Sequence, residues 1–184
     1  MQVIDASNRP NDRHGYSAYC LVLMAPEPIR SRIHEFRDSV RPMRAMIGAH
    51  VTALGTFCEI ESLDAVNERI SAAIGRTEPL GLSATGEVLE LGDHTSAIAK
   101  IDVTPEMQLL HDRLAEEILP IAVNAYGDPG SYMAHLTFYQ EIPMAEVERA
   151  GQRAHAFEID DFVVPNLTLM GRVGTAANGI WREI

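Results

Sequence analysis

Two short segments of the chain combine a histidine with a threonine two residues later, in otherwise apolar sequence. They read AHVTA, with His50 and Thr52, and AHLTF, with His135 and Thr137. An imidazole titrates near pH 6.5, so around neutral pH one histidine can accept a proton while the other donates one. Threonine hydroxyls can donate hydrogen bonds to the non-bridging oxygens of a phosphate. The four residues together indicate acid–base chemistry on a phosphodiester, without a metal.

The elements that position these residues follow from the hydrophobic pattern. Apolar, β-rich runs predict strands, and apolar residues at spacings of three and four predict helices. The expected strands span 15–25, 49–57, 80–91 (with a kink at Gly86), 96–103, 132–142 and 179–184. The expected helices begin near Pro26, Leu63, Thr104 and Met144.

The two halves of the chain repeat one plan: a strand, a helix opened by Pro-Glu, a loop, and a strand carrying H-x-T. The interval from Pro26 to His50 is 24 residues and that from Pro105 to His135 is 30, which is typical of an internal duplication with loops of different length. Alternate residues of a strand face the same side, so each histidine projects with its threonine. If the halves pack about a pseudo-two-fold axis, both pairs converge on one groove.

The H-x-[ST] pattern alone is weak evidence, because seven histidines among nine threonines and nine serines produce on the order of one match by chance. A third match begins at His94, which follows Gly-Asp as a turn residue would. A single strand histidine is more often structural than catalytic, and the matching places of His50 and His135 in the two halves reverse that judgement. We expect structural or surface roles for the other four histidines: His14, His34, His111 and His155.

Composition and charge restrict the class of protein. The chain has 184 residues, 46% hydrophobic and 22% charged, which suits one domain. It has no apolar run of the roughly 20 residues that a membrane helix needs, and its polar start lacks a secretory h-region, so we expect a cytoplasmic protein. A net charge of -11 argues against binding of long nucleic acid and leaves small phosphate esters as candidate ligands. Neither cysteine, Cys20 or Cys58, has zinc-site spacing, so we expect buried thiols.

The chain resembles the two-histidine (2H) phosphoesterase superfamily, and especially its bacterial 2'-5' RNA ligase/cyclic phosphodiesterase branch. The resemblance rests on HVTA (50–53), HLTF (135–138), their separation of 85 residues and the closing segment 163–184. It implies an α+β fold of two lobes related by a pseudo-two-fold axis, with antiparallel sheets lining a central cleft and helices outside. The expected domains are a flexible N-terminal arm, 1–15, and a single bilobal domain, 16–184.

The resemblance also implies an activity: metal-independent opening of 2',3'-cyclic phosphates, or related chemistry on nucleotides and RNA ends. In that scheme His50 is the general acid, His135 is the general base that activates water, and Thr52 and Thr137 hold the phosphate. No cofactor or metal is implied. The expected partner is a small nucleotide or a short RNA end, and the expected state is a monomer.

The chain departs from this branch after the second motif, where many relatives carry a basic residue and this chain has Gln140. Three arginines are candidates for the missing charge: Arg41, Arg44 and Arg172. Tyr132 and Tyr139 are candidates for stacking on a base, with core packing as the alternative. The departure leaves open a second function, a non-catalytic nucleotide- or RNA-end-binding module, and a third, in which the strand histidines are purely structural.

Overall fold

The computed structural model describes residues 9–40, 47–75, 78–125, 131–176 and 178–184. The strands in this part of the chain are β1 (Ala18–Met24), β2 (His50–Cys58), β3 (Leu80–Leu82), β4 (Ala84–Leu91), β5 (Ser96–Ile101), β6 (Val123–Asn124), β7 (His135–Tyr139), β8 (Phe162–Val164), β9 (Leu167–Val173) and β10 (Ile180–Glu183). The helices are α1 (Ile29–Val40), α2 (Leu63–Ile74), α3 (Pro105–Ile118), α4 (Met144–His155) and the short 3₁₀ turn η1 (Leu119–Ile121).

The helix ends follow the capping residues in the sequence. Ser62 precedes α2, and its hydroxyl accepts a hydrogen bond from the Ala65 amide at 3.0 Å. The Thr104 hydroxyl does the same for α3, which then begins at a proline. Gly75 follows α2 with a φ of 55°, a conformation in which a glycine costs little. The helices expected near Leu63, Thr104 and Met144 are therefore confirmed with their predicted starts, whereas the helix expected to open at Pro26 begins at Ile29.

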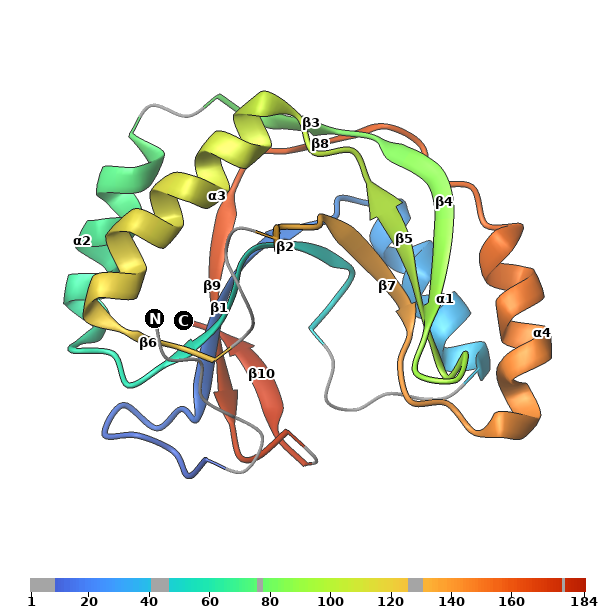
Figure 1. Cartoon of the computed structure of the whole chain (residues 1–184), viewed down its shortest axis with the longest axis horizontal. Coiled ribbons are helices and arrows are strands. Elements are labelled where there is room, and N and C mark those ends of the chain that lie inside the picture. The colour runs from blue at the N-terminus through green and yellow to red at the C-terminus, as the bar shows by residue number, and fades with distance from the viewer. Residues whose placement is uncertain (1–8, 41–46, 76–77, 126–130, 177) are drawn as a thin grey trace.

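The strands form one continuous antiparallel sheet in the order β10-β9-β1-β2-β7-β5-β4, with β6 added to β2 and a separate pair β3-β8. Figure 1 shows this sheet bent into an arch, with α2 and α3 outside one half and α4 outside the other. Strands from the first part of the chain lie next to strands from the second part where β2 meets β7. The expected mixed α+β, two-lobed architecture with antiparallel sheet and outer helices is confirmed.

The sheet has two unlike faces. The outer face packs against the helices in the main core, to which Leu21, Leu23 and Leu136 contribute. We call the opposite face, which carries the two histidine–threonine pairs, the inner face. In the β1–β9 half it carries a small second apolar cluster, made of Cys20, Val22, Met24, Ile47, Met170 and Trp181. Both cysteines are free and buried, as expected, and burial raises the pKa of the Cys20 thiol.

The expected N-terminal arm differs from the structure over its last residues. The Asp12 carboxylate accepts hydrogen bonds from the His14 amide at 2.8 Å and from the Tyr19 hydroxyl at 2.8 Å. The Asn11 side chain accepts one from the Gly174 amide at 2.9 Å. This part of the arm is therefore fastened to the sheet, and residues 1–8 lie outside the described residues. Within the described ranges no helix has the length and apolar character that crossing a membrane requires.

Candidate active site

The two halves of the sheet join at one residue pair. Strands β2 and β7 are antiparallel, and their registered partners are Val51 and Leu136, the central residues of the two H-x-T motifs. Both side chains are fully buried on the outer face. We call this contact the seam. A two-fold axis through the seam exchanges one motif for the other, so the structure contains the expected pseudo-symmetry at its centre.

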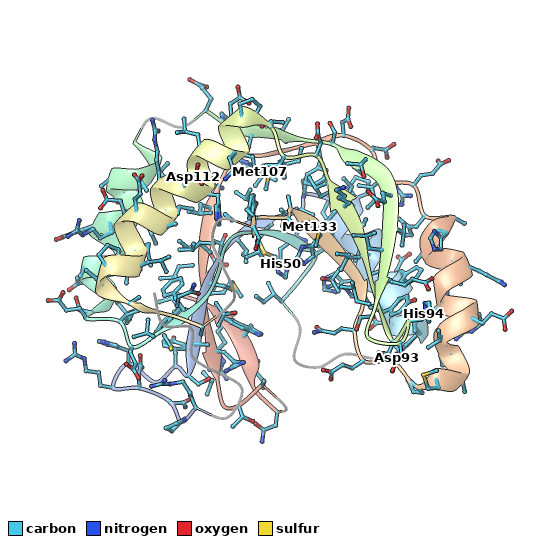
Figure 2. All side chains as sticks on the ribbon, in the orientation of Figure 1. His50, Asp93, His94, Met107, Asp112 and Met133 are labelled. Atoms are coloured by element: carbon cyan, nitrogen blue, oxygen red, sulfur yellow. The ribbon has the colours of Figure 1, made fainter. Side chains whose placement is uncertain are left out.

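The seam determines where the four polar side chains lie. In an antiparallel pair the residues that flank two partners are themselves neighbours, so His50 lies beside Thr137 and Thr52 beside His135. Such neighbours have Cβ atoms about 4.5 to 5.5 Å apart. All four residues are half-buried and face the inner side. The two imidazoles therefore stand diagonally across a small rectangle, and Figure 2 shows His50 at the middle of the arch.

Each imidazole is held by the backbone in the same way. Nδ1 of His50 lies 2.7 Å from the Gly48 carbonyl oxygen, and Nδ1 of His135 lies 3.1 Å from the Met133 carbonyl oxygen. A carbonyl can only accept a hydrogen bond, so Nδ1 carries the proton in the neutral ring and Nε2 is the basic nitrogen. The same contact two residues upstream in both strands gives the two rings equivalent orientations.

Burial lowers the pKa of His50 to about 4. The hydrogen bond to the Gly48 carbonyl acts in the opposite direction, and the positive charges of Arg37 and His135 lower the pKa further. In the free protein at neutral pH, His50 is therefore a neutral imidazole with a lone pair on Nε2.

A buried arginine connects the second motif with the segment that precedes the first motif. Arg37, on α1, is only 4% exposed. Its Nη2 donates to the Thr137 carbonyl at 2.6 Å and its Nη1 to the Ile47 carbonyl at 3.2 Å. Burial lowers the pKa of Arg37 to about 10, which leaves it charged at neutral pH. Its Nε is buried and has no hydrogen-bond partner in the part of the chain that the structure describes.

A second contact supports the first motif from the other half of the chain. The Tyr132 hydroxyl donates to the Thr52 carbonyl at 2.8 Å, and burial raises the pKa of this phenol. The Tyr132 ring stacks on His111 with centroids 4.1 Å apart, and Nδ1 of His111 lies 2.8 Å from the Ala53 carbonyl oxygen. Thus Arg37 from the first half holds Thr137, and Tyr132 from the second half holds Thr52.

Tyr139 is in the core and not on the inner face. The register between β5 and β7 shifts by one residue between Ala97 and Ile98, so the alternation that carries His135 inward is lost before Tyr139. Its ring is fully buried and stacks on Phe36 with centroids 6.4 Å apart. The candidate role in base stacking is therefore replaced by core packing.

Arg172 is distant from the seam. It pairs with Ala18 at the start of β1, whereas His50 pairs with Met24 at the end of β1. Six residues of strand separate these positions by roughly 20 Å. Its Nε donates to the Ser17 hydroxyl at 3.0 Å. Arg172 therefore does not supply charge beside the two histidines.

The other two arginine candidates, Arg41 and Arg44, lie outside the described residues. Gln140 is exposed at the end of β7. Among the histidines for which structural or surface roles were expected, His111 is buried, and its ring stacks on Tyr132.

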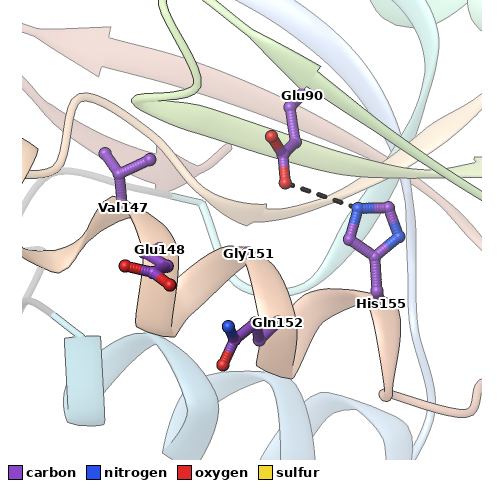
Figure 3. A pocket seen from close by; sticks show the side chains of 6 residues that line it. All are labelled: Glu90, Val147, Glu148, Gly151, Gln152 and His155. Atoms are coloured by element: carbon purple, nitrogen blue, oxygen red, sulfur yellow. Dashed lines mark ion pairs between the residues drawn. The ribbon is translucent and has the colours of Figure 1, made fainter.

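A hollow of about 510 Å³ lies on the outer side of the fold, between α4 and β4 (Figure 3). It contains Glu90, which is 3.4 Å from Nε2 of His155 and 2.5 Å from Nδ1 of His94. Glu90 pairs with Ala97, a residue of the main core, so it projects from the outer face. Figure 2 shows His94 at the tip of the β4–β5 hairpin, away from His50. The third H-x-[ST] match therefore belongs to a different part of the surface.

The fold, with one H-x-T strand from each half meeting at its centre, defines the class of two-histidine phosphoesterases. A family model of the 2'-5' RNA ligase superfamily matches residues 25–176, and the chain belongs to this superfamily. No curated protein matches the chain by sequence.

Solved structures agree with this assignment at the level of the fold. Apo E. coli LigT matches with a TM-score of 0.55 and 15% identity, over 91% of this chain and 94% of that one. E. coli LigT complexed with 3'-AMP gives 0.54 at 14% identity, over 90% and 93%. E. coli LigT complexed with NADP+ gives 0.55 at 12% identity, over 96% of both chains.

Proposed function

We propose that the protein hydrolyses a cyclic phosphodiester of a nucleotide or an RNA end, with His50 and His135 as its acid–base pair. The observation that carries the proposal is the seam, which brings two imidazoles and two hydroxyls to one face of the sheet. The membership of the chain in a superfamily of phosphoesterases supports the same reaction class. The E. coli LigT structures with 3'-AMP and NADP+ support a nucleotide as the ligand.

In the proposed reaction a water molecule attacks the phosphorus atom. Nε2 of His135 takes a proton from this water, the bond between phosphorus and a ribose oxygen breaks, and Nε2 of His50 gives a proton to the departing oxygen. The ring opens to a phosphate monoester and a hydroxyl, and a second exchange of protons with solvent restores the two imidazoles. The hydroxyls of Thr52 and Thr137 donate to the non-bridging oxygens as charge develops.

His50 must gain a proton before it can act as the acid, because its pKa of about 4 leaves it neutral in the free protein. A phosphate monoanion at 4 Å stabilises an imidazolium by about 4 kcal/mol when the effective dielectric constant is near 20. This corresponds to a rise in pKa of roughly 3 units, which returns His50 to the neutral range. Substrate binding and protonation of the acid are therefore coupled in this proposal.

The direct test follows ring opening of nucleoside 2',3'-cyclic phosphates by phosphorus NMR in the presence of EDTA. We expect turnover that survives EDTA and disappears in both His50→Ala and His135→Ala. His94→Ala is the matched control, since this histidine also belongs to an H-x-[ST] sequence but lies on the β4–β5 hairpin. Full activity in both His50→Ala and His135→Ala would contradict the proposal.

The second function left open by Gln140 is binding without turnover. The same incubation separates the two, because a binding module perturbs the phosphorus signal of the cyclic phosphate but produces no monoester. Turnover by the wild type that is lost in His50→Ala and His135→Ala, but not in His94→Ala, excludes the non-catalytic binding module.

A further inference from the structure

The chain of 184 residues contains a single lysine, Lys100, against fourteen arginines. Lys100 lies on β5, where its registered partner on β7 is His135. Partners in an antiparallel pair project from the same face, with Cβ atoms about 4.5 to 5.5 Å apart. The lysine therefore stands on the inner face, directly beside one of the two histidines of the seam.

The packing of β5 agrees with this placement. Ala97, Ala99 and Ile101 belong to the main core on the outer face, whereas Ile98 and Lys100 do not. Successive residues of a strand face opposite sides and alternate residues face the same side, so Ile98 and Lys100 share the inner side.

The ammonium group of Lys100 is directed away from the seam. Its Nζ lies 3.0 Å from a carboxylate oxygen of Glu87, on β4. In the sheet order β2-β7-β5-β4, Glu87 is on the far side of Lys100 from the phosphate position between His50 and His135. The two paired side chains are 42% and 50% exposed. An ion pair this exposed contributes little to stability and can exchange one anion for another.

Resting on the proposed function, we propose that Lys100 binds a second phosphate group of the substrate, on the β5 side of the phosphodiester that reacts at the seam. A lysine ammonium on its flexible stem is a common phosphate ligand. His135 stands between Lys100 and the reacting phosphate, so the group that reaches the ammonium is the next phosphate along the molecule. The substrate class is then a cyclic phosphate that carries a further phosphate, such as a 5'-phosphorylated nucleotide or the last residues of an RNA chain.

The kinetic test compares adenosine 2',3'-cyclic phosphate with its 5'-phosphorylated form. We expect Lys100→Met to lower kcat/KM about tenfold for the 5'-phosphorylated substrate and to leave the other substrate within about twofold. Lys100→Arg should keep most of the difference between the substrates. Glu87→Gln is the opposing variant, and it should raise kcat/KM for the 5'-phosphorylated substrate by about two- to threefold because it frees the ammonium. Equal losses on both substrates in Lys100→Met would overturn the proposal.

A binding test does not depend on turnover. Reductive ¹³C-methylation of His50→Ala protein labels one side chain, Lys100, in addition to the N-terminal amine. Adenosine 2',5'-bisphosphate should shift the Lys100 methyl signal, and adenosine 2'-monophosphate should not. A shift with the bisphosphate alone supports the second-phosphate site even if the wild type hydrolyses neither substrate, which would refute only the catalytic proposal. Absence of that shift, or the same shift with both ligands, would overturn the role of Lys100.

Discussion

Val51 and Leu136 are registered partners, and they are the central residues of the two H-x-T motifs. This one pair joins the halves of the sheet and sets the diagonal arrangement of the two histidines. Because both side chains are fully buried on the outer face, the hydrophobic core on one side of the sheet determines the geometry of the polar residues on the other.

Truncating one side chain of this pair should impair the active site more than it impairs the fold. We expect Leu136→Ala to destabilise the protein by about 2 to 5 kcal/mol, as buried leucine truncations do, and to lower kcat because the two motifs lose their fixed separation. Leu114→Ala on α3 is the matched control, since Leu114 is also a fully buried leucine of the same core but lies outside the two H-x-T strands. Urea unfolding measures the loss of stability of each variant. The value of kcat is then measured under conditions in which each variant is folded. Equal effects of the two variants on kcat would show that the seam has no special role.

Arg37 offers a way to separate geometry from charge. Arg37→Met removes the guanidinium whose charge lowers the pKa of His50, so that pKa should rise, and it also removes the donors to the Thr137 and Ile47 carbonyls. Arg37→Lys keeps a positive charge but cannot make the same two-pronged contact. We expect both variants to lose kcat/KM by at least about tenfold, and only the methionine variant to raise the pKa, measured from the NMR titration of the His50 ring proton. If kcat/KM is unchanged in Arg37→Lys, Arg37 contributes to catalysis through its charge alone and not through the geometry of its hydrogen bonds.

The sequence predicted most of the helices and strands and the two motifs because hydrophobic periodicity and capping are local properties. The single strand expected over 80–91 is instead β3 and β4, which belong to different sheets, and β9 was not predicted. It could not predict that Val51 pairs with Leu136, since the pairing joins strands 85 positions apart and depends on the whole sheet. Arg37 was missed because an arginine on an amphipathic helix ordinarily faces solvent, and only the assembled fold places carbonyls of two segments around it. Tyr139 was misplaced because a register shift has no simple sequence signal. The two histidine–threonine pairs of the inner face were therefore predictable, whereas Lys100 beside them and the residues that support them from behind were not.

Tyr132 should act through position rather than contact with the reacting atoms. Tyr132→Phe removes the hydrogen bond to the Thr52 carbonyl and keeps the ring that stacks on His111. We expect a loss of stability of about 1 kcal/mol and a fall in kcat of a few-fold, with KM nearly constant. Tyr16→Phe, which changes a tyrosine away from the seam, is the comparison for any general effect of losing a hydroxyl. A large rise in KM in Tyr132→Phe would instead point to direct contact between this hydroxyl and the substrate.

The hollow between α4 and β4 should be independent of catalysis. Glu90 and His155 line it (Figure 3) on the outer side of the sheet, opposite to the inner face that carries His50 and His135. We expect Glu90→Gln and His155→Ala to leave kcat/KM within about twofold, because their partners are helix and hairpin residues. Steady-state kinetics on the cyclic phosphate that the wild type prefers provides the measurement. A tenfold loss in either variant would mean that the outer face and the seam are coupled.

The low pKa of His50 also predicts how stability changes with pH. An unfolded chain binds a proton at this histidine below about pH 6.5, whereas the folded protein does so only near pH 4. Between these values the unfolded state carries more protons, so the free energy of unfolding falls as the pH decreases through this window. His50→Gln cannot titrate and removes this contribution, so relative to the wild type it should gain about 1 to 3 kcal/mol between pH 7.5 and pH 4. Urea unfolding of both proteins at several pH values measures the difference. A constant difference across the window would show that His50 has an ordinary pKa in the folded state.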